Sequence, residues 1–373
     1  MLVLAIAAFF VFSAGTSGPS YEFKFLVFMV VLFCIIYLAV LAVMRLEAFD
    51  TPLKIALLMP AAMAAMLVTV LLNQQTAILF VVMLSLGILC ASNFMLAPTL
   101  FAFFSGIAGV SVIRNMRKRF DLVKSACILA LINPLIIIVI SVALPDPVND
   151  LSFLIAMASV NGFMGGILVI GFLPILETAL NTSTSFRLME FSDLNSPIMK
   201  KMLLTASGTY NHSIMVATLA ESACREIGAD PLVARVGAYY HDIGKMEQSE
   251  YFVENQVDGN KHLALNPRLS ATVIRSHVKQ GVEKAIQMRL PRQVVDIIAE
   301  HHGNSVISYF YNEAKKLDET VDPENFTYPG NPPRSKESAV VMLADVVEAA
   351  CRTLEKPSVP RLEKFITELV NKK

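Results

Sequence analysis

Long apolar runs with almost no charge fill the first half of the chain and limit what it can fold into. Residues 1–180 contain 8 Lys+Arg and 7 Asp+Glu, whereas residues 181–373 contain 23 and 24. The sequence as a whole is 55% hydrophobic, above the usual share in a soluble domain. Because about 20 apolar residues can cross a bilayer as a helix, the sequence predicts a polytopic membrane region followed by a soluble one. Neither half is basic enough for a nucleic acid polymer to be a partner.

About seven spans are predicted in the transmembrane region, residues 1–180, and the basic residues Arg45 and Lys54 leave the count at six or seven. They lie near 2–15, 25–44, 55–72, 77–92, 94–113, 125–144 and 151–176. The uncharged stretch 76–113 is too long for one span and is divided near Asn93. The spans hold almost no ionisable residue, which favours an anchor or sensor over a transporter. Asn133 and Asn161 are expected to form hydrogen bonds between helices.

The orientation follows from one basic loop. Lys and Arg are retained on the cytoplasmic side of a membrane, and this loop contains Arg114, Arg117, Lys118, Arg119 and Lys124. We therefore expect a multi-pass protein of the cell membrane, with the lipid bilayer as a partner and the C-terminal half in the cytoplasm. The five cysteines show no paired spacing, in agreement with a reducing compartment.

The soluble half is predicted to be all-α. Residues 181–205 form a juxtamembrane linker, in which Ser196 and Pro197 are a good N-cap and first position for a short helix to about Thr205. That helix either transmits movement or simply packs on the next domain. Residues 206–373 form the domain itself, because apolar positions recur with helical spacing near 214–223, 231–243, 269–287, 291–302, 304–316, 336–353 and 358–371.

All six histidines lie between His212 and His302, and five of them belong to a candidate metal site. The candidate ligands are His212, His241, Asp242, His277, His301, His302 and Asp345. Taken singly, each has an ordinary explanation, such as a buried carboxylate or a histidine at a helix end. Together, imidazole and carboxylate without thiolate suit Mn, Fe, Zn or Ni. Seven ligands are too many for one tetrahedral ion, and two ions close together suit phosphoester hydrolysis.

Several short motifs carry a resemblance to a known family. They are GTYNHS (208–213), GAYYHDIGK (237–245), YFVENQ (251–256), HHG (301–303) and LAD (343–345). The central motif resembles the HD phosphohydrolase signature, and the set is similar to the seven-transmembrane HD family of PgpH-type cyclic di-AMP phosphodiesterases. The resemblance covers essentially the whole chain, including the order of spans followed by an HD domain.

The resemblance implies roles for the matching residues. One divalent ion, Mn or Fe, would be held by His212, His241, Asp242 and Asp345. A second would be held by His277, His301 and His302, with Asp242 as the bridge. Asp242 and Lys245 are the implied catalytic residues. Lys245 would contact a phosphate or the leaving oxygen. The alternative interpretation is that Lys245 is a surface lysine in an ordinary ion pair. The implied reaction opens cyclic di-AMP to the linear dinucleotide pApA.

Three alternatives stay open at this stage. Hydrolysis of cyclic di-GMP is disfavoured because the Gly-Tyr-Pro motif of that HD subgroup is lacking in 303–311. A mononucleotide phosphohydrolase would not need His277, His301 and His302. A non-catalytic nucleotide receptor need not bind metal. A homodimer is an assembly that the sequence leaves open. Family members typically carry a large extracytoplasmic domain, which this sequence lacks, so it is a short form or a piece of a longer protein.

Overall fold

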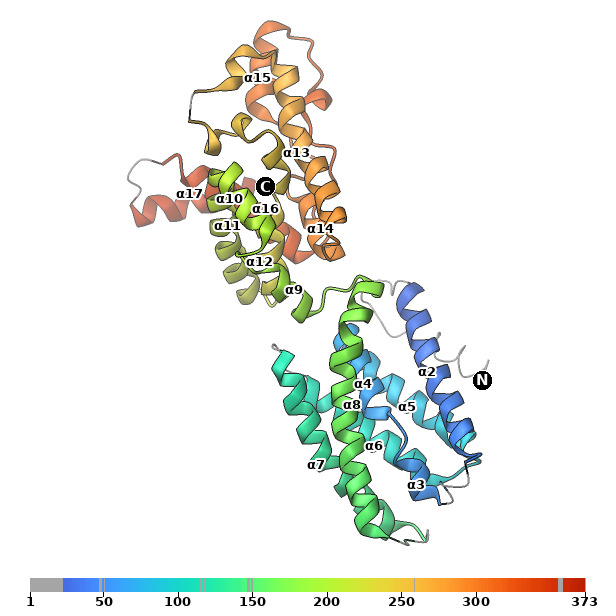
Figure 1. The fold of residues 1–373 in the computed structure, drawn as a ribbon. Helices are drawn as coiled ribbons and strands as arrows, with labels where there is room; N and C mark the ends of the chain where they lie inside the picture. The colour runs from blue at the N-terminus through green and yellow to red at the C-terminus, as the bar shows by residue number, and fades with distance from the viewer. Residues whose placement is uncertain are drawn as a thin grey trace. The chain divides into compact units, whose positions relative to one another are not determined.

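The computed structural model describes residues 23–46, 49, 51–114, 116, 119–145, 148, 150–257, 259–354 and 358–372. The chain divides into two compact units, Met1–Phe186 and Arg187–Lys373, which are described one at a time (Figure 1). The span predicted near 2–15 lies outside the described residues.

Six helical segments of the first unit are long and apolar enough to cross a membrane. They are α2 (Phe23–Val43), α3 with α4 (Pro52–Ala56 and Ala61–Leu71), α5 (Gln74–Ala91), α6 (Leu96–Ile113), α7 (Arg119–Ala143) and α8 (Leu151–Leu180). These segments confirm, by length and composition, the six apolar helices predicted after the first one. The predicted division near Asn93 is also confirmed, since α5 ends just before it and the backbones of Asn93 and Phe94 adopt positive φ values of 54° and 63°.

Small residues let these helices approach one another closely. A Cβ added to Gly109 of α6 would lie 2.8 Å from the carbonyl oxygen of Ala62 in α4, and one added to Gly162 of α8 would overlap the backbone of Leu129 in α7. Without a hydrophobic driving force between helices in lipid, such close packing is a main source of association. The glycines therefore fix which helices are neighbours.

A polar bridge crosses the interior of this unit. Ser105 donates a hydrogen bond to Asn133 Oδ1 (3.0 Å), and Asn133 Nδ2 donates to Asn161 Oδ1 (2.9 Å). Asn161 Nδ2 in turn donates to the carbonyls of Leu57 (2.8 Å) and Met59 (3.2 Å), where the segment between α3 and α4 is not helical. The predicted interhelical hydrogen bonds are confirmed, and they also satisfy carbonyls that the break in the helix leaves free.

The second unit begins in α9 (Ser185–Phe191) and continues with α10 (Pro197–Thr205), which has the bounds expected from the sequence. Ser196 occupies the N-cap position, but its side chain makes no capping hydrogen bond. Met199 and Met202 of α10 are both 1% exposed and belong to the same core as Val216 of α11. The apolar face of α10 is thus part of this unit's core.

The remaining helices confirm the predicted all-α class. They are α11 (Ser207–Glu226), α12 (Pro231–Tyr240), α13 (Pro267–Gln287), α14 (Arg292–Glu300), α15 (Ser308–Leu317), α16 (Lys336–Cys351) and α17 (Val359–Lys372). Four 3-10 turns lie between α12 and α13, namely η1 (Ile243–Glu247), η2 (Ser249–Tyr251), η3 (Val253–Asn255) and η4 (Lys261–Ala264), and a fifth, η5, is Pro323–Phe326. Within the described ranges the one β feature is an isolated bridge between Val306 and Thr327.

Candidate metal centre

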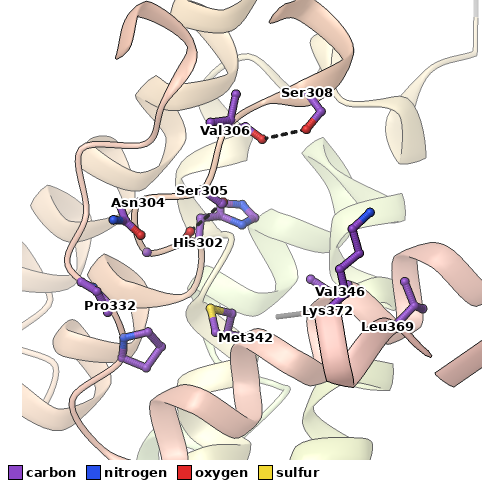
Figure 2. Close-up of a pocket in the computed structure, with 12 residues that line it drawn as sticks. His302, Asn304, Ser305, Val306, Ser308, Pro332, Met342, Val346, Leu369 and Lys372 are labelled. Carbon is purple, nitrogen blue, oxygen red and sulfur yellow. Dashed lines mark hydrogen bonds between the residues drawn. The ribbon is translucent and has the colours of Figure 1, made fainter. Parts of the chain in front are cut away.

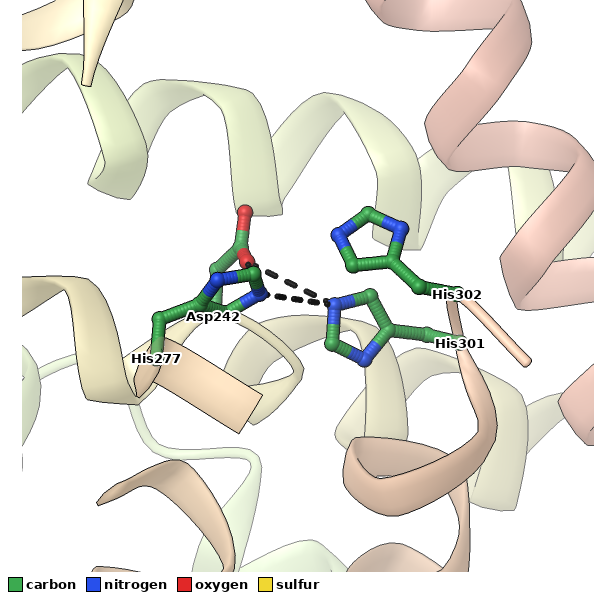
Figure 3. Close-up of side chains that lie close together, drawn as sticks. All are labelled: Asp242, His277, His301 and His302. Atoms are coloured by element: carbon green, nitrogen blue, oxygen red, sulfur yellow. Dashed lines mark hydrogen bonds and ion pairs between the residues drawn. The ribbon is translucent and has the colours of Figure 1, made fainter. Parts of the chain in front are cut away.

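Five helical elements bring all seven candidate ligands to one place. His212 projects from α11, His277 from α13 and Asp345 from α16, while two further pairs, His241–Asp242 and His301–His302, directly follow the ends of α12 and α14. The ligand atoms form two groups, within each of which the atoms lie within 4.8 Å of one another. One group is His212, His241 and Asp345; the other, drawn in Figure 3, is Asp242, His277, His301 and His302.

The carboxylate of Asp242 lies between the two groups. Its Oδ2 is 3.1 Å from His241 Nε2 and 3.6 Å from His212 Nε2. Its Oδ1 is 3.3 Å from His277 Nε2 and 3.6 Å from His301 Nε2. Each oxygen therefore faces a different set of imidazoles, which is the arrangement that a bridging carboxylate requires.

Backbone carbonyls fix the orientation of three of these rings. The Nδ1–H groups of His241, His277 and His301 donate to the carbonyls three residues earlier, those of Ala238 (2.8 Å), Ile274 (2.6 Å) and Ile298 (2.8 Å). A carbonyl can only accept, so the proton of a neutral ring lies on Nδ1 and the Nε2 lone pair faces the centre. This use of the second nitrogen is typical of metal-binding histidines.

The other two rings are held by side chains. His212 Nδ1 contacts the carboxylate of Glu348, and Arg352 Nη2 lies 3.1 Å from the same nitrogen. The ring of His302 stacks on Tyr328, with ring centroids 4.3 Å apart and an interplanar angle of 29°. Both contacts restrict the rotation of a candidate ligand without using the nitrogen that faces the centre.

Lys245 lies in a buried ion-pair network rather than at the surface. Its Nζ is 2.6 Å from Asp242 Oδ2 and 2.9 Å from Glu254 Oε1. Glu254 also accepts a hydrogen bond from Thr209 Oγ1 (3.0 Å). The ammonium thus has a fixed position beside the carboxylate that separates the two groups.

The protonation states suit metal binding. Burial lowers the pKa of His277 to about 3, in spite of the nearby Asp242 charge, so this ring is neutral near pH 7. Burial would raise the pKa of Asp242, but the neighbouring His241 and the ammonium of Lys245 hold it well below its usual range. A neutral imidazole and an ionised carboxylate are the forms that coordinate an ion.

The residues present fit a pair of divalent ions. His241 Nε2 and Asp242 Oδ1 are buried and have no hydrogen-bond partner among the described residues, although such atoms nearly always have one. Two ligands that each lie about 2.0–2.2 Å from one ion are at most about 4.4 Å apart, close to the spacing within each group. The donors are nitrogen and oxygen, which Mn, Fe and Zn accept.

A cavity of about 600 Å³ opens onto this centre and is large enough for a small organic ligand. His212, Lys245, His277, His302, Tyr328 and Asp345 contribute to its wall. Two aromatic residues that follow the paired histidines, Tyr309 and Tyr311, do not line this cavity: Tyr309 is exposed and Tyr311 packs on Phe326. His262 belongs to neither group and its Nε2 bonds to the carbonyl of Tyr251.

Four residues of the site were not predicted from the sequence: Glu254, Tyr328, Glu348 and Arg352. Glu348 and Arg352 follow Asp345 by three and seven residues on α16, and residues at such spacing share one helix face. That spacing is a signal that could have identified them. Glu254 lies within the YFVENQ motif, but no local pattern pairs it with Lys245.

Two family models match the chain. The first, described as a 7TM receptor with intracellular HD hydrolase, matches residues 1–184. The second, the HD domain, matches residues 209–350. Together they cover the membrane unit and all seven candidate ligands.

Two named bacterial proteins are similar over much of the chain. The cyclic-di-AMP phosphodiesterase PgpH of Bacillus subtilis is 35% identical over 358 residues, which are 92% of this chain and 50% of the relative. PgpH of Listeria monocytogenes is 36% identical over 322 residues, 85% of this chain and 45% of the relative. The chain therefore spans about half the length of these relatives.

Among solved structures, the HD domain of L. monocytogenes PgpH in complex with cyclic-di-AMP is 41% identical. The match covers 48% of this chain and 85% of the chain in that structure, with a TM-score of 0.47.

Proposed function

Because the chain belongs to the seven-transmembrane HD family, we propose that it is a membrane-anchored, metal-dependent phosphodiesterase that opens cyclic di-AMP to pApA. The observation that carries this proposal is the carboxylate of Asp242, whose two oxygens face two separate groups of ligands. Two ions so arranged would activate a water molecule and stabilise the charge that develops on a phosphodiester.

Each group of ligands would hold one ion, Mn or Fe. His212, His241 and Asp345 hold the first and His277, His301 and His302 the second, with Asp242 shared. Glu348 and the backbone carbonyls keep the imidazoles in the orientation that binding needs.

Lys245 would act on the substrate rather than on the ions. Its ammonium forms part of the cavity wall beside Asp242, and Glu254 prevents it from turning away. From this position it can donate to a phosphoryl oxygen or to the leaving oxygen, which is where negative charge increases during the reaction. Asp242 and Lys245 are thus the proposed catalytic residues.

Cyclic di-AMP is proposed as the substrate because both PgpH relatives are named for it. The absence of a Gly-Tyr-Pro motif after His302 disfavours cyclic di-GMP.

The proposed organisation is a membrane region over residues 1–180, a linker over 181–205 and the HD domain over 206–373. The basic loop near Arg114 would place the HD domain in the cytoplasm, where a cyclic dinucleotide messenger can reach it.

A side-by-side turnover assay tests the proposal. The detergent-purified chain is incubated with Mn²⁺ or Fe²⁺ and with cyclic di-AMP, cyclic di-GMP or a mononucleotide, and the products are separated by chromatography. We expect pApA from cyclic di-AMP at a higher kcat/KM than any product from the others. Preferred turnover of cyclic di-GMP would reassign the substrate, and no turnover with either metal would reject the enzyme.

A further inference from the structure

A second cavity, of about 610 Å³, adjoins the one over the candidate metal centre (Figure 2). The two cavities share His302 and Val346 in their walls. Because His302 is a candidate ligand, a molecule held at the centre can extend past this ring into the second cavity. The further walls come from the loop after α14, from the Pro332–Pro333 segment and from α17.

The walls of the second cavity combine apolar surface with a lysine that forms no ion pair with any residue in the described part of the chain. Met342 and Val346 of α16 and Leu369 of α17 supply the apolar side. Planar bases bind well to such surfaces, and a thioether makes favourable contacts with aromatic rings. Lys372 also lines the cavity (Figure 2). On the same helix Lys364 is paired with Glu368 at 3.9 Å, whereas no carboxylate of the described residues is paired with Lys372.

Together these features fit one nucleotide: an apolar surface for the base and, for the phosphate, the ammonium of Lys372. We propose that the second cavity binds the half of the dinucleotide whose phosphodiester is not being cleaved. Its base lies against Met342 and Leu369, and its phosphate faces Lys372. This inference rests on the proposed function and adds the means by which a dinucleotide is distinguished from smaller phosphodiesters.

A substrate without a second nucleotide cannot use this cavity. A small chromogenic diester such as bis(p-nitrophenyl) phosphate reaches only the cavity over the metal centre. The ratio of kcat/KM for cyclic di-AMP to kcat/KM for this diester therefore isolates the contribution of the second cavity.

The test compares Lys372→Glu and Leu369→Ala with the unmodified chain. Replacing the ammonium by a carboxylate should lower that ratio by at least about five- to tenfold, mainly through the KM for the dinucleotide. Loss of one charge-assisted hydrogen bond at an accessible position accounts for about that much, and repulsion between the carboxylate and the phosphate acts in the same direction. Leu369→Ala should lower it in the same direction. Lys364→Glu makes the same change of charge on the same helix, away from the cavity, and should leave the ratio unchanged.

The outcomes are separable. If the unmodified chain hydrolyses cyclic di-AMP and neither Lys372→Glu nor Leu369→Ala changes the ratio, the second cavity is not a nucleotide site and the proposed function stands. If Lys364→Glu lowers the ratio as much as Lys372→Glu does, a nonspecific long-range electrostatic effect explains the result and the inference is wrong. If the chain hydrolyses the small diester but no dinucleotide, the proposed function fails and this inference fails with it.

Discussion

At the scale of single residues, Asp242 decides whether two ions can be held close together. It is 1% exposed and is surrounded by four imidazoles and the ammonium of Lys245. A buried carboxylate in such a position either balances the positive charge of the neighbouring side chains or binds a metal ion. The orphaned Oδ1 atom favours metal.

Replacing Asp242 by Asn should remove the bridge. We expect the metal content to fall from about two ions per chain to one or fewer. We also expect kcat to fall by more than about 100-fold, because at least one ion is lost together with the negative charge of the carboxylate between the two. Elemental analysis and turnover are measured together. Asp318→Asn, a change at an exposed aspartate, is the control. Full metal content in Asp242→Asn would contradict the bridging role.

Glu348 is expected to act on His212 and not on the substrate. Replacing it by Gln removes the charge that holds the Nδ1 side of that ring, and carboxylate partners of this kind typically change metal affinity by about 10- to 100-fold. A titration of the metal-free protein with Mn²⁺ measures the change. Glu363→Gln on α17 should bind as the unmodified protein does; equal affinities in both variants would rule out the positioning role.

At the scale of elements, the turn between α12 and α13 is the part that the sequence predicted least well. The helical spacing predicts α11 to α17. Of these, α11 to α14 and α16 bury one face in a common core, and α15 packs in a smaller second core. The 3-10 turns η1 to η4 have no such periodicity, so their course depends on tertiary contacts. Glu254 lies in η3, and it contacts Lys245 only because the backbone follows this path. The break between α3 and α4 was missed for a similar reason, since Asn161 stabilises it from another helix.

The close approach of η1 to α13 makes Gly244 a sensitive position. An added Cβ would overlap the carbonyl oxygen of His277 and would lie 2.7 Å from the amide nitrogen of Gly281. Gly244→Ala should therefore destabilise the HD unit by roughly 1–3 kcal/mol and weaken metal binding at His277. Thermal unfolding checks the first effect and a metal titration the second. Gly171→Ala, with nothing within 4 Å of the new Cβ, serves as the comparison; unchanged stability of Gly244→Ala would show that the two segments move apart easily.

At the scale of the whole molecule, the sequence already separates a membrane region from a metal-binding one. One half is adapted to the lipid bilayer and the other to water, so the two halves differ in their content of charged residues. This difference can be seen in the sequence without a structure. The family resemblance already implied the seven candidate ligands and their division into two groups. Spacing along the sequence could not have shown that division, because residues from α11 to α16 meet only in the folded domain.

Orientation in the membrane can be measured with fusions to the C-terminus. If the basic loop lies in the cytoplasm, so does the HD domain. A fused green fluorescent protein should then fluoresce in a bacterial host, and a fused alkaline phosphatase should be inactive. The reverse pattern would place the HD domain outside the cell and remove it from cytoplasmic messengers.

Anomalous diffraction from crystals of the manganese-loaded protein tests the central claim, a two-ion centre bridged by Asp242, most directly. We predict two peaks per chain, one beside His212, His241 and Asp345 and one beside His277, His301 and His302, with the Asp242 carboxylate between them. A single peak, or two peaks that do not share Asp242, would contradict it.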